Sequence, residues 1–274
     1  MRHARAGGKK AAVWVAALMF LNVGLPSAPA AMAVTARFTR LVKNVALVRP
    51  GAPARAAQAT DTIGPGALVQ TAADSRAELT FADRTVARLG GKTAVRLGAE
   101  NLELAEGAIL FDGPGGTSTA TIRTGTIVIE GGGATGIIER SGRTYAKIML
   151  LQGTARVYLP AKVGESMLLE AGQILIMKPE ATSLAEPVDF SIAQLYKTSL
   201  LIHHEFPSLT SESAIVAAIA RQKADPSLIP TNLIIYGRGT LVNLADPAAA
   251  KKAAAQNPRS SPSPTPRPSA KPNR

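Results

Sequence analysis

The region from about Val34 to Met177 alternates apolar and polar residues in short runs that end at glycine, aspartate or asparagine. Residues 77–81, 85–89 and 93–97 show this most clearly, because each run alternates and then stops at turn residues. Alternation with a period of two is typical of half-buried strands. No run with helical spacing separates them, so the pattern predicts a mainly β domain over residues 34–180.

A recurring unit joins these runs: an apolar stretch leads to a polar residue, then to glycine, and then to another strand. We expect structural corners at Gly66, Gly107, Gly153 and Gly172, because glycine adopts positive φ without the penalty that a β-carbon brings. The spacing is uneven, so a regular repeat array is not expected, and the units suit a β-roll or solenoid-type domain. Further strands are expected at residues 102–104, 108–111, 119–124, 126–130, 136–139, 145–151, 155–159, 166–169 and 174–177.

Residues 181–250 are predicted to form a small α/β annex that follows a linker at 181–187. Helical spacing of apolar residues predicts helices from Phe190 to Ile202, capped by Asp189 or Ser191, and from Ser211 to Lys223, capped by Ser211. A hairpin is expected at 233–244. So small an annex cannot bury enough surface alone, and we expect it to pack on the β domain or on a partner.

The first 33 residues have the order of a secretory signal peptide. A basic start precedes an apolar run from Ala11 to Leu21, helix breakers follow, and Ala31 and Ala33 form an A-x-A cleavage site. The alternative is a retained membrane anchor, but the run is shorter than the roughly 20 apolar residues that spanning requires. We therefore expect a cleaved signal and a periplasmic or secreted protein, not a cytoplasmic one.

The net charge of +12 is concentrated at the two ends of the chain. Residues 1–33 contain four basic groups and residues 251–274 contain six, with no acidic group in either segment. The remaining 21 basic and 19 acidic groups leave the body at +2, so nucleic acid is not an expected partner. Residues 251–274 are rich in proline and serine, which predicts a disordered tail, either a simple linker or a weak attractor of anionic polysaccharide or membrane surfaces.

Candidate reaction chemistry is sparse along the chain. The absence of cysteine excludes disulfides and thiolate metal sites. Gly131–Gly136 satisfies G-x-G-x-x-G, but β-branched residues follow it, which favours a glycine turn over a dinucleotide site. His203 and His204 are adjacent and have no acidic cluster near them in sequence, so a metal site is not expected there. We expect no catalytic residues, no cofactor and no metal.

A set of segments, taken in order, resembles the FecR domain, an extracytoplasmic all-β module. The segments are Gly64–Thr71, Ser75–Gly90, Leu104–Ala108, Ala120–Thr124, Leu150–Val157 and Leu169–Gln173. The resemblance covers about residues 45–180, and Gly133–Ile137 departs from the corner that is usual in the family. Regulators in this family carry a helical sigma-binding domain before a membrane span. Because only ten residues precede the apolar run, a stand-alone FecR-like domain is expected here.

Together these features predict an exported, non-enzymatic FecR-domain protein that acts as an envelope or extracellular interaction or scaffold module. Its expected partner is an envelope or extracellular protein. The alternative is a polysaccharide or cell-wall binding module guided by the basic tail. The sequence leaves the oligomeric state open.

Overall fold

The computed structural model describes residues 35–113, 120–162, 164–203, 205–222 and 228. The chain forms two compact units, Met1–Ala31 and Met32–Arg274, and every described residue belongs to the second unit. The predicted signal peptide with Ala31 and Ala33, the hairpin at 233–244 and the tail at 251–274 lie outside the described residues.

The described residues form seventeen strands and two short helices, which confirms the mainly β fold class. The strands make two sheets. Sheet A contains, in spatial order, β4 (Thr62–Ile63), β1 (Ala36–Val42), β6 (Arg76–Phe81), β7 (Val86–Leu89), the second half of β9 (Leu102–Asp112), β12 (Thr135–Ser141), β13 (Tyr145–Gln152), β16 (Gln173–Met177) and β17 (Val188–Asp189).

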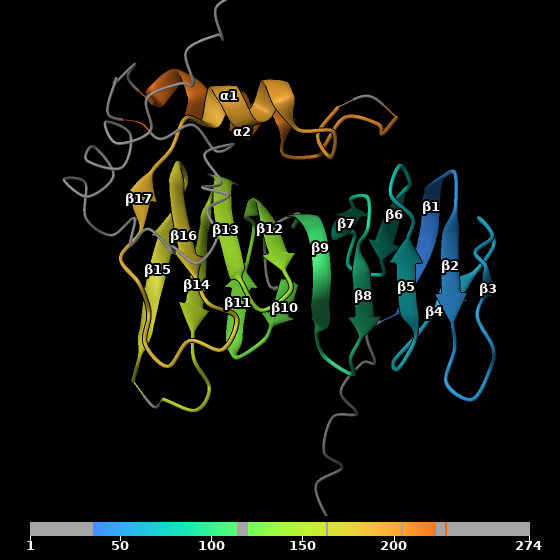
Figure 1. Cartoon of the computed structure of the whole chain (residues 1–274). Coiled ribbons are helices and arrows are strands. Elements are labelled where there is room, and N and C mark those ends of the chain that lie inside the picture. Colours follow the sequence, from blue (N-terminus) through green and yellow to red (C-terminus); the bar gives the residue numbers. More distant parts are fainter. Residues whose placement is uncertain (1–34, 114–119, 163, 204, 223–227, 229–274) are drawn as a thin grey trace, which may run out of the picture. The chain divides into compact units, whose positions relative to one another are not determined.

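Sheet B contains the remaining strands and the first half of β9. Its spatial order is β3 (Arg55–Ala56), β2 (Val45–Val48), β5 (Leu68–Thr71), β8 (Ala94–Leu97), β9, β10 (Ala120–Thr124), β11 (Ile127–Gly131), β14 (Thr154–Tyr158) and β15 (Ser166–Glu170). Neighbouring strands are antiparallel except for the parallel pair β9–β10. From β10 to β17 the chain places two strands in one sheet and the next two in the other, so it advances as a roll (Figure 1).

Strand β9 links the two sheets. Residues 102–106 pair with β8 in sheet B, whereas Gly107 to Asp112 pair with β12 in sheet A. Gly107 has φ +90°, and a Cβ there would lie 2.4 Å from Thr93 Oγ1. The strands predicted at 102–104 and 108–111 are therefore one continuous strand. It passes from one sheet to the other at position 107, which only glycine can occupy without strain.

Alternate strand positions fill the space between the sheets. In β8, for example, Val95 and Leu97 are fully buried while Arg96 between them is exposed. Side chains from both sheets join one continuous apolar core, including Val69 from sheet B and Leu79 from sheet A. Burying each large apolar side chain contributes about 1.5–3 kcal/mol, so this core is the main source of stability.

A second apolar cluster lies on the outer face of sheet A. Helices α1 (Ile192–Thr198) and α2 (Glu212–Arg221) contribute Leu195 and Ile215 to it, and sheet A contributes Leu110, Ile137 and Met149. The annex therefore packs on the β domain, beside the green and yellow strands (Figure 1). Both helices fall within their predicted ranges and are shorter than predicted. Within the described part of the chain, neither helix is long and apolar enough to cross a membrane.

The two predicted helix caps differ in outcome. The Ser191 hydroxyl accepts a hydrogen bond from Gln194 N, as expected for an N-cap. Ser211 occupies the N-cap position of α2 but makes no side-chain cap bond. Its hydroxyl lies instead 2.7 Å from Thr135 Oγ1 on sheet A. Ser211 thus ties the helix to the sheet instead of capping the helix.

Candidate interaction site

Arg88 fastens the annex to sheet A. Its side chain, 1% exposed, extends from β7 on the outer face, where Nε donates to Glu78 Oε2 at 2.8 Å. The two terminal nitrogens donate to the backbone oxygens of Leu201, Ile202 and Pro207. The guanidinium also lies 4.8 Å from the centre of the Phe206 ring. One side chain therefore contacts four described residues of the connection between α1 and α2.

The charge of Arg88 is balanced by its acidic neighbours. Burial lowers the pKa of the guanidinium below its ordinary value, and the bond to Glu78 and the charges of Asp112 and Glu212 oppose that change. An arginine with so high an ordinary pKa remains charged at neutral pH. Arg88 is thus a buried cation whose bonds are all directed to the annex and to β6, and we assign it a structural role.

A polar group at the far end of β9 lies where Ser211 of the annex meets Thr135 of sheet A. Thr135 Oγ1 donates to Asp112 Oδ1 at 2.8 Å and accepts from Gln152 Nε2 at 2.9 Å. Asp112 Oδ2 is buried and has no hydrogen-bond partner among the described residues. In the annex itself, the Tyr196 hydroxyl donates to Glu212 Oε1 at 2.7 Å, and this bond raises the pKa of Tyr196 to about 12. These bonds order the sheet and the annex on either side of the Ser211–Thr135 contact.

The outer face of sheet B, here called the open face, carries no helix among the described residues. The pairing register sets its side chains in rows across the sheet. One row contains Leu68, Arg96, Glu103, Arg123, Val128, Tyr158 and Ser166, and a second contains Thr121, Glu130, Arg156 and Leu168. Opposite charges are neighbours within these rows, because Glu103 lies between Arg96 and Arg123 and Glu130 lies beside Arg156. The face has no single-sign field that would attract a polyanion.

Tyr158 contacts one charge of each sign on the open face. Its hydroxyl donates to Glu130 Oε1 at 2.7 Å, and that bond raises the pKa of Tyr158. The Arg156 guanidinium lies 5.0 Å from the Tyr158 ring centre.

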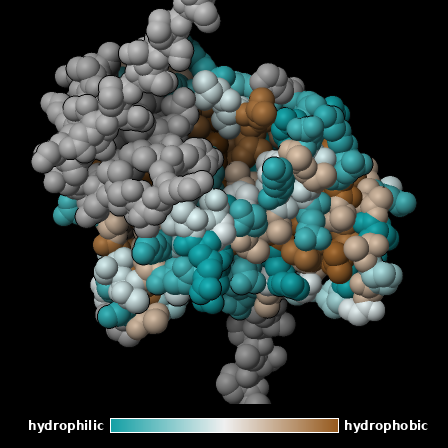
Figure 2. All heavy atoms as spheres, in the orientation of Figure 1, coloured by the Kyte–Doolittle hydropathy of each residue, from teal (hydrophilic) through white to brown (hydrophobic). Residues whose placement is uncertain are grey.

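Figure 2 shows one side of the molecule, on which hydrophilic residues predominate and apolar residues gather in separate patches.

The sheet edges differ in length. Three of the four edge strands, β3, β4 and β17, have two residues each, whereas β15 has five. Short edge strands protect a sheet from pairing with other chains, and a longer edge exposes more main-chain groups. Leu168, at the centre of β15, is 59% exposed, the highest value among the large apolar side chains described. Among the described terminal strands of the two sheets, β15 is therefore the longest, and it carries an exposed leucine at its centre.

The register shows which groups of β15 point outward. Leu159 N donates to Glu165 O, so by alternation Met167 and Leu169 exchange backbone bonds with β14. The N–H and C=O groups of Ser166, Leu168 and Glu170 then point away from β14. Consistent with this, Glu170 N donates to the Gln173 side chain at 2.9 Å. We call these outward groups, together with the Leu168 side chain, the β15 edge.

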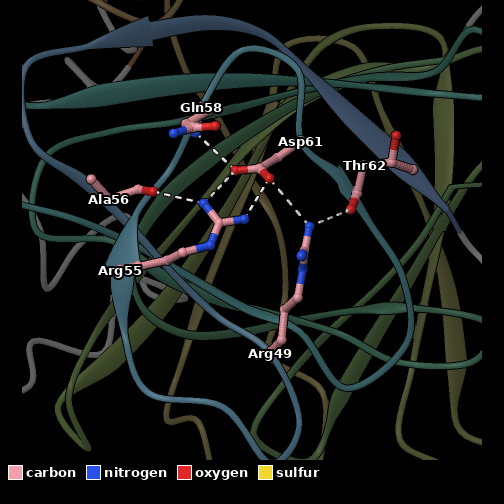
Figure 3. Close-up of polar contacts among 6 residues, drawn as sticks. All are labelled: Arg49, Arg55, Ala56, Gln58, Asp61 and Thr62. Atoms are coloured by element: carbon pink, nitrogen blue, oxygen red, sulfur yellow. Dashed lines mark hydrogen bonds and ion pairs between the residues drawn. The ribbon is translucent and has the colours of Figure 1, made fainter.

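An Asp61 cluster stabilises the opposite end of the sheets. Its carboxylate accepts bonds from Arg49, Arg55 and the backbone N–H of Gln58, and Arg49 and Arg55 also bond the carbonyls of Thr62 and Ala56 (Figure 3). The bond from Arg55 lowers the pKa of Asp61 from 3.8 to about 2. The cluster holds the short strands β3 and β4 beside the longer strands, and its groups are already paired with one another.

The residues singled out from the sequence lie in turns and bends. Gly66, Gly107, Gly153 and Gly172 have φ values of +83°, +90°, +74° and +87°. Gly131–Gly136 spans the turn between β11 and β12. His203 packs edge-on against Tyr196, with ring centres 4.5 Å apart. Within the described ranges, no group of three or more histidine, aspartate or glutamate side chains could hold a metal ion.

Sequence patterns did not identify Arg88 or the β15 edge. Arg88 occupies a polar position in the alternating run 85–89, and local alternation does not show that the annex covers this side chain. Its carbonyl partners at Leu201 and Ile202 are 113 and 114 residues away. The strand at 166–169 was predicted, but local alternation does not show which strands lie at a sheet edge.

Two solved structures share limited similarity with the chain. Both are crystal structures of a candidate anti-sigma factor from Parabacteroides distasonis ATCC 8503, at 2.50 and 1.65 Å. The first is 15% identical, with a TM-score of 0.40, and the match covers 48% of this chain and 64% of that one. The second is 16% identical, with a TM-score of 0.40, and the match covers 59% and 79%. This chain thus spans less than two thirds of the first structure.

The comparison with curated proteins found no match. A family model does match within the roll. Residues 67–156, from the residue before β5 to the middle of β14, match the family described as FecR protein, which confirms the FecR resemblance for this part of the chain.

Proposed function

We propose that this protein is an exported, non-enzymatic interaction or scaffold module of the cell envelope or extracellular space, and that it binds through the β15 edge. The contrast among the edges carries the proposal: three edge strands have two residues each, whereas β15 presents five residues and an exposed Leu168. An exposed edge binds a partner strand by main-chain hydrogen bonds, with alternate side chains giving selectivity.

The two broad faces support binding at an edge. The annex covers the outer face of sheet A, and Arg88 holds it there. The open face of sheet B carries charges of both signs in neighbouring positions. Main-chain groups at the β15 edge therefore offer bonding capacity beside an exposed apolar side chain, Leu168.

The alternative, binding of acidic polysaccharide or cell wall, depends on the basic segment 251–274, since the charges of the open face compensate one another. Deleting residues 251–274 separates the two proposals. An electrostatic tail predicts that envelope association falls on deletion and at high salt. Binding at the β15 edge predicts that association persists under both conditions.

Photocrosslinking in intact cells tests the proposal. A photoreactive amino acid at Leu168 should yield covalent products in the envelope or extracellular fraction. The matched control places the same group at Gln70, an exposed residue of β5 in the interior of sheet B. Recovery of the protein in the cytosol, or the same products from positions 168 and 70, would contradict the proposal.

A further inference from the structure

We infer that the partner of the β15 edge is a second copy of this chain, paired antiparallel about a two-fold axis through Leu168. The inference rests on the proposed function, because it names the occupant of the same edge. It follows from the symmetry of the outward groups, the position of the exposed leucine and the placement of charge around it.

The outward main-chain groups of β15 are self-complementary. They belong to Ser166, Leu168 and Glu170, which are spaced evenly on either side of Leu168. When two such strands meet antiparallel, Leu168 faces Leu168 of the second copy and Ser166 faces its Glu170. Every outward N–H then lies opposite an outward C=O. On dimerisation, the backbone N–H of Glu170 gives up its hydrogen bond to the Gln173 side chain and donates instead to the second copy.

The apolar contact falls at the centre of this arrangement. Leu168 projects from the open face and is 59% exposed in the single chain. Directly opposite residues in an antiparallel pair approach closely enough for their side chains to pack. The two copies of Leu168 therefore cover each other, at the position where a two-fold axis requires identical residues to meet.

The charges around Leu168 are complementary between copies. Arg156 lies beside Leu168 on β14, and its Nη2 is 3.5 Å from Ser166 Oγ. Because Ser166 faces Glu170 of the second copy, the carboxylate of that Glu170 arrives next to the Arg156 guanidinium. Within one chain Glu170 faces Thr154, so it has no cation opposite it on β14. The two-fold axis therefore places two equivalent Arg156–Glu170 pairs across the interface.

The connection between β16 and β17 passes close to the start of β15 without pairing with it. Leu184 N donates to the Glu165 side chain at 2.7 Å, and Leu184 packs on the main core. Among the described residues, no backbone bond joins this connection to Ser166 or Leu168. The outward groups of β15 thus remain available next to it.

Cysteine crosslinking gives a register-specific test, since the chain has no cysteine of its own. In the purified full-length protein, Leu168→Cys should form a disulfide-linked dimer under mild oxidation, because residue 168 faces itself across the axis. Ser166→Cys, on the same strand and also exposed, faces Glu170 of the second copy and should remain monomeric under the same conditions. Equal crosslinking of both variants, or of neither, would overturn the inference.

Sedimentation of the purified protein gives an independent measurement. An edge of five residues buries little surface, so the unmodified chain should show reversible, concentration-dependent dimerisation. Leu168→Lys should lower the association constant by about tenfold or more, and Glu170→Lys should also lower it. Glu100→Lys makes the same charge change at an exposed residue between β8 and β9 and should leave association unchanged.

The outcomes separate this inference from the proposed function. A purified chain that remains monomeric at all concentrations, while position 168 crosslinks in cells to a different envelope protein, overturns the inference and leaves the function standing. A monomeric chain without any envelope crosslink from position 168 overturns both. A product of twice the chain mass from position 168, absent from position 70, supports both.

Discussion

Charged side chains in this protein differ sharply in their exposure to solvent. Arg88 and Glu78 are almost fully buried, and the remaining donors of Arg88 bond carbonyl oxygens of the annex. Asp61 is also buried, but Arg49 and Arg55 reach it from solvent, with 45% and 40% of their side chains exposed. Removing one partner of a buried pair leaves an uncompensated charge, whereas pairs open to water contribute less.

Asp61→Asn tests the exposed type of pairing by its pH dependence. At pH 7 the variant should lose about 1 kcal/mol of unfolding free energy, because bonds to two half-exposed arginines are weakened. The folded-state pKa of Asp61 is lowered from 3.8 to about 2, so the wild type keeps this contribution above about pH 4 and loses it as the pH falls toward 2. Urea unfolding of both proteins should therefore show their stabilities converging across that window.

The matched control is Asp74→Asn, because Asp74 is exposed and lies 4.0 Å from Lys43. This variant should match the wild type in stability at every pH. If the gap between wild type and Asp61→Asn stayed constant down to pH 2, the lowered pKa would be wrong.

At the level of elements, β9 determines how the two sheets connect. It leaves sheet B and enters sheet A without a break, and Thr93 approaches its backbone at the crossing. Thr93 Oγ1 accepts from Ala108 N at 3.0 Å, which satisfies a backbone group where the strand bends. A side chain at position 107 would disturb this approach and the backbone conformation together.

Gly107→Ala should destabilise the protein by more than about 2 kcal/mol, since it combines a positive φ with a clash against Thr93 and the Lys92 carbonyl. Gly142→Ala is the matched variant, because Gly142 also has positive φ, at +51°, but has no atom within 4 Å of a Cβ. It should lose only about 1 kcal/mol. Thermal or urea unfolding measures both, and equal losses would show that the clash at the crossing has no effect.

Local alternation predicted most of the roll because inward positions recur every second residue. The β8 run with Arg96 exposed between Val95 and Leu97 is an example. The same reasoning predicts two strands where the structure has the single strand β9, because a glycine usually ends a strand. The sequence does not show that the strand can continue past Gly107 by pairing in the other sheet. The burial of Arg88 is not predictable from local alternation for a related reason. It depends on contacts with the annex, which no pattern within β7 reveals.

At the scale of the whole molecule, the described residues contain two apolar clusters with different roles. The larger one lies between the sheets and includes residues from β1 to β16. The smaller one joins the annex to the outer face of sheet A. Because this second cluster is the smaller one and lies on the outer face of a single sheet, the annex should open before the roll unfolds.

Arg88→Lys tests this order of opening. Lysine keeps the charge but cannot bond Glu78 and the annex carbonyls together, so amides of α1 and α2 should exchange hydrogen faster by about tenfold or more. Amides of sheet B should keep their protection, as measured by hydrogen exchange with mass spectrometry. Arg96→Lys, an exposed change on sheet B, should alter neither region, and uniform loss of protection in Arg88→Lys would contradict separate opening.

The winding of the roll has a consequence for how the chain matures during synthesis. The most distant residues paired in either sheet, Ala36 and Phe81, are 45 positions apart, and each strand after β9 pairs with at least one strand made before it. The strands of a growing polypeptide can therefore pair in the order in which they are synthesised. No early strand has to remain unpaired until the end of the chain is made. In the dimer inferred above, by contrast, the β15 edge pairs only after a second copy has been made.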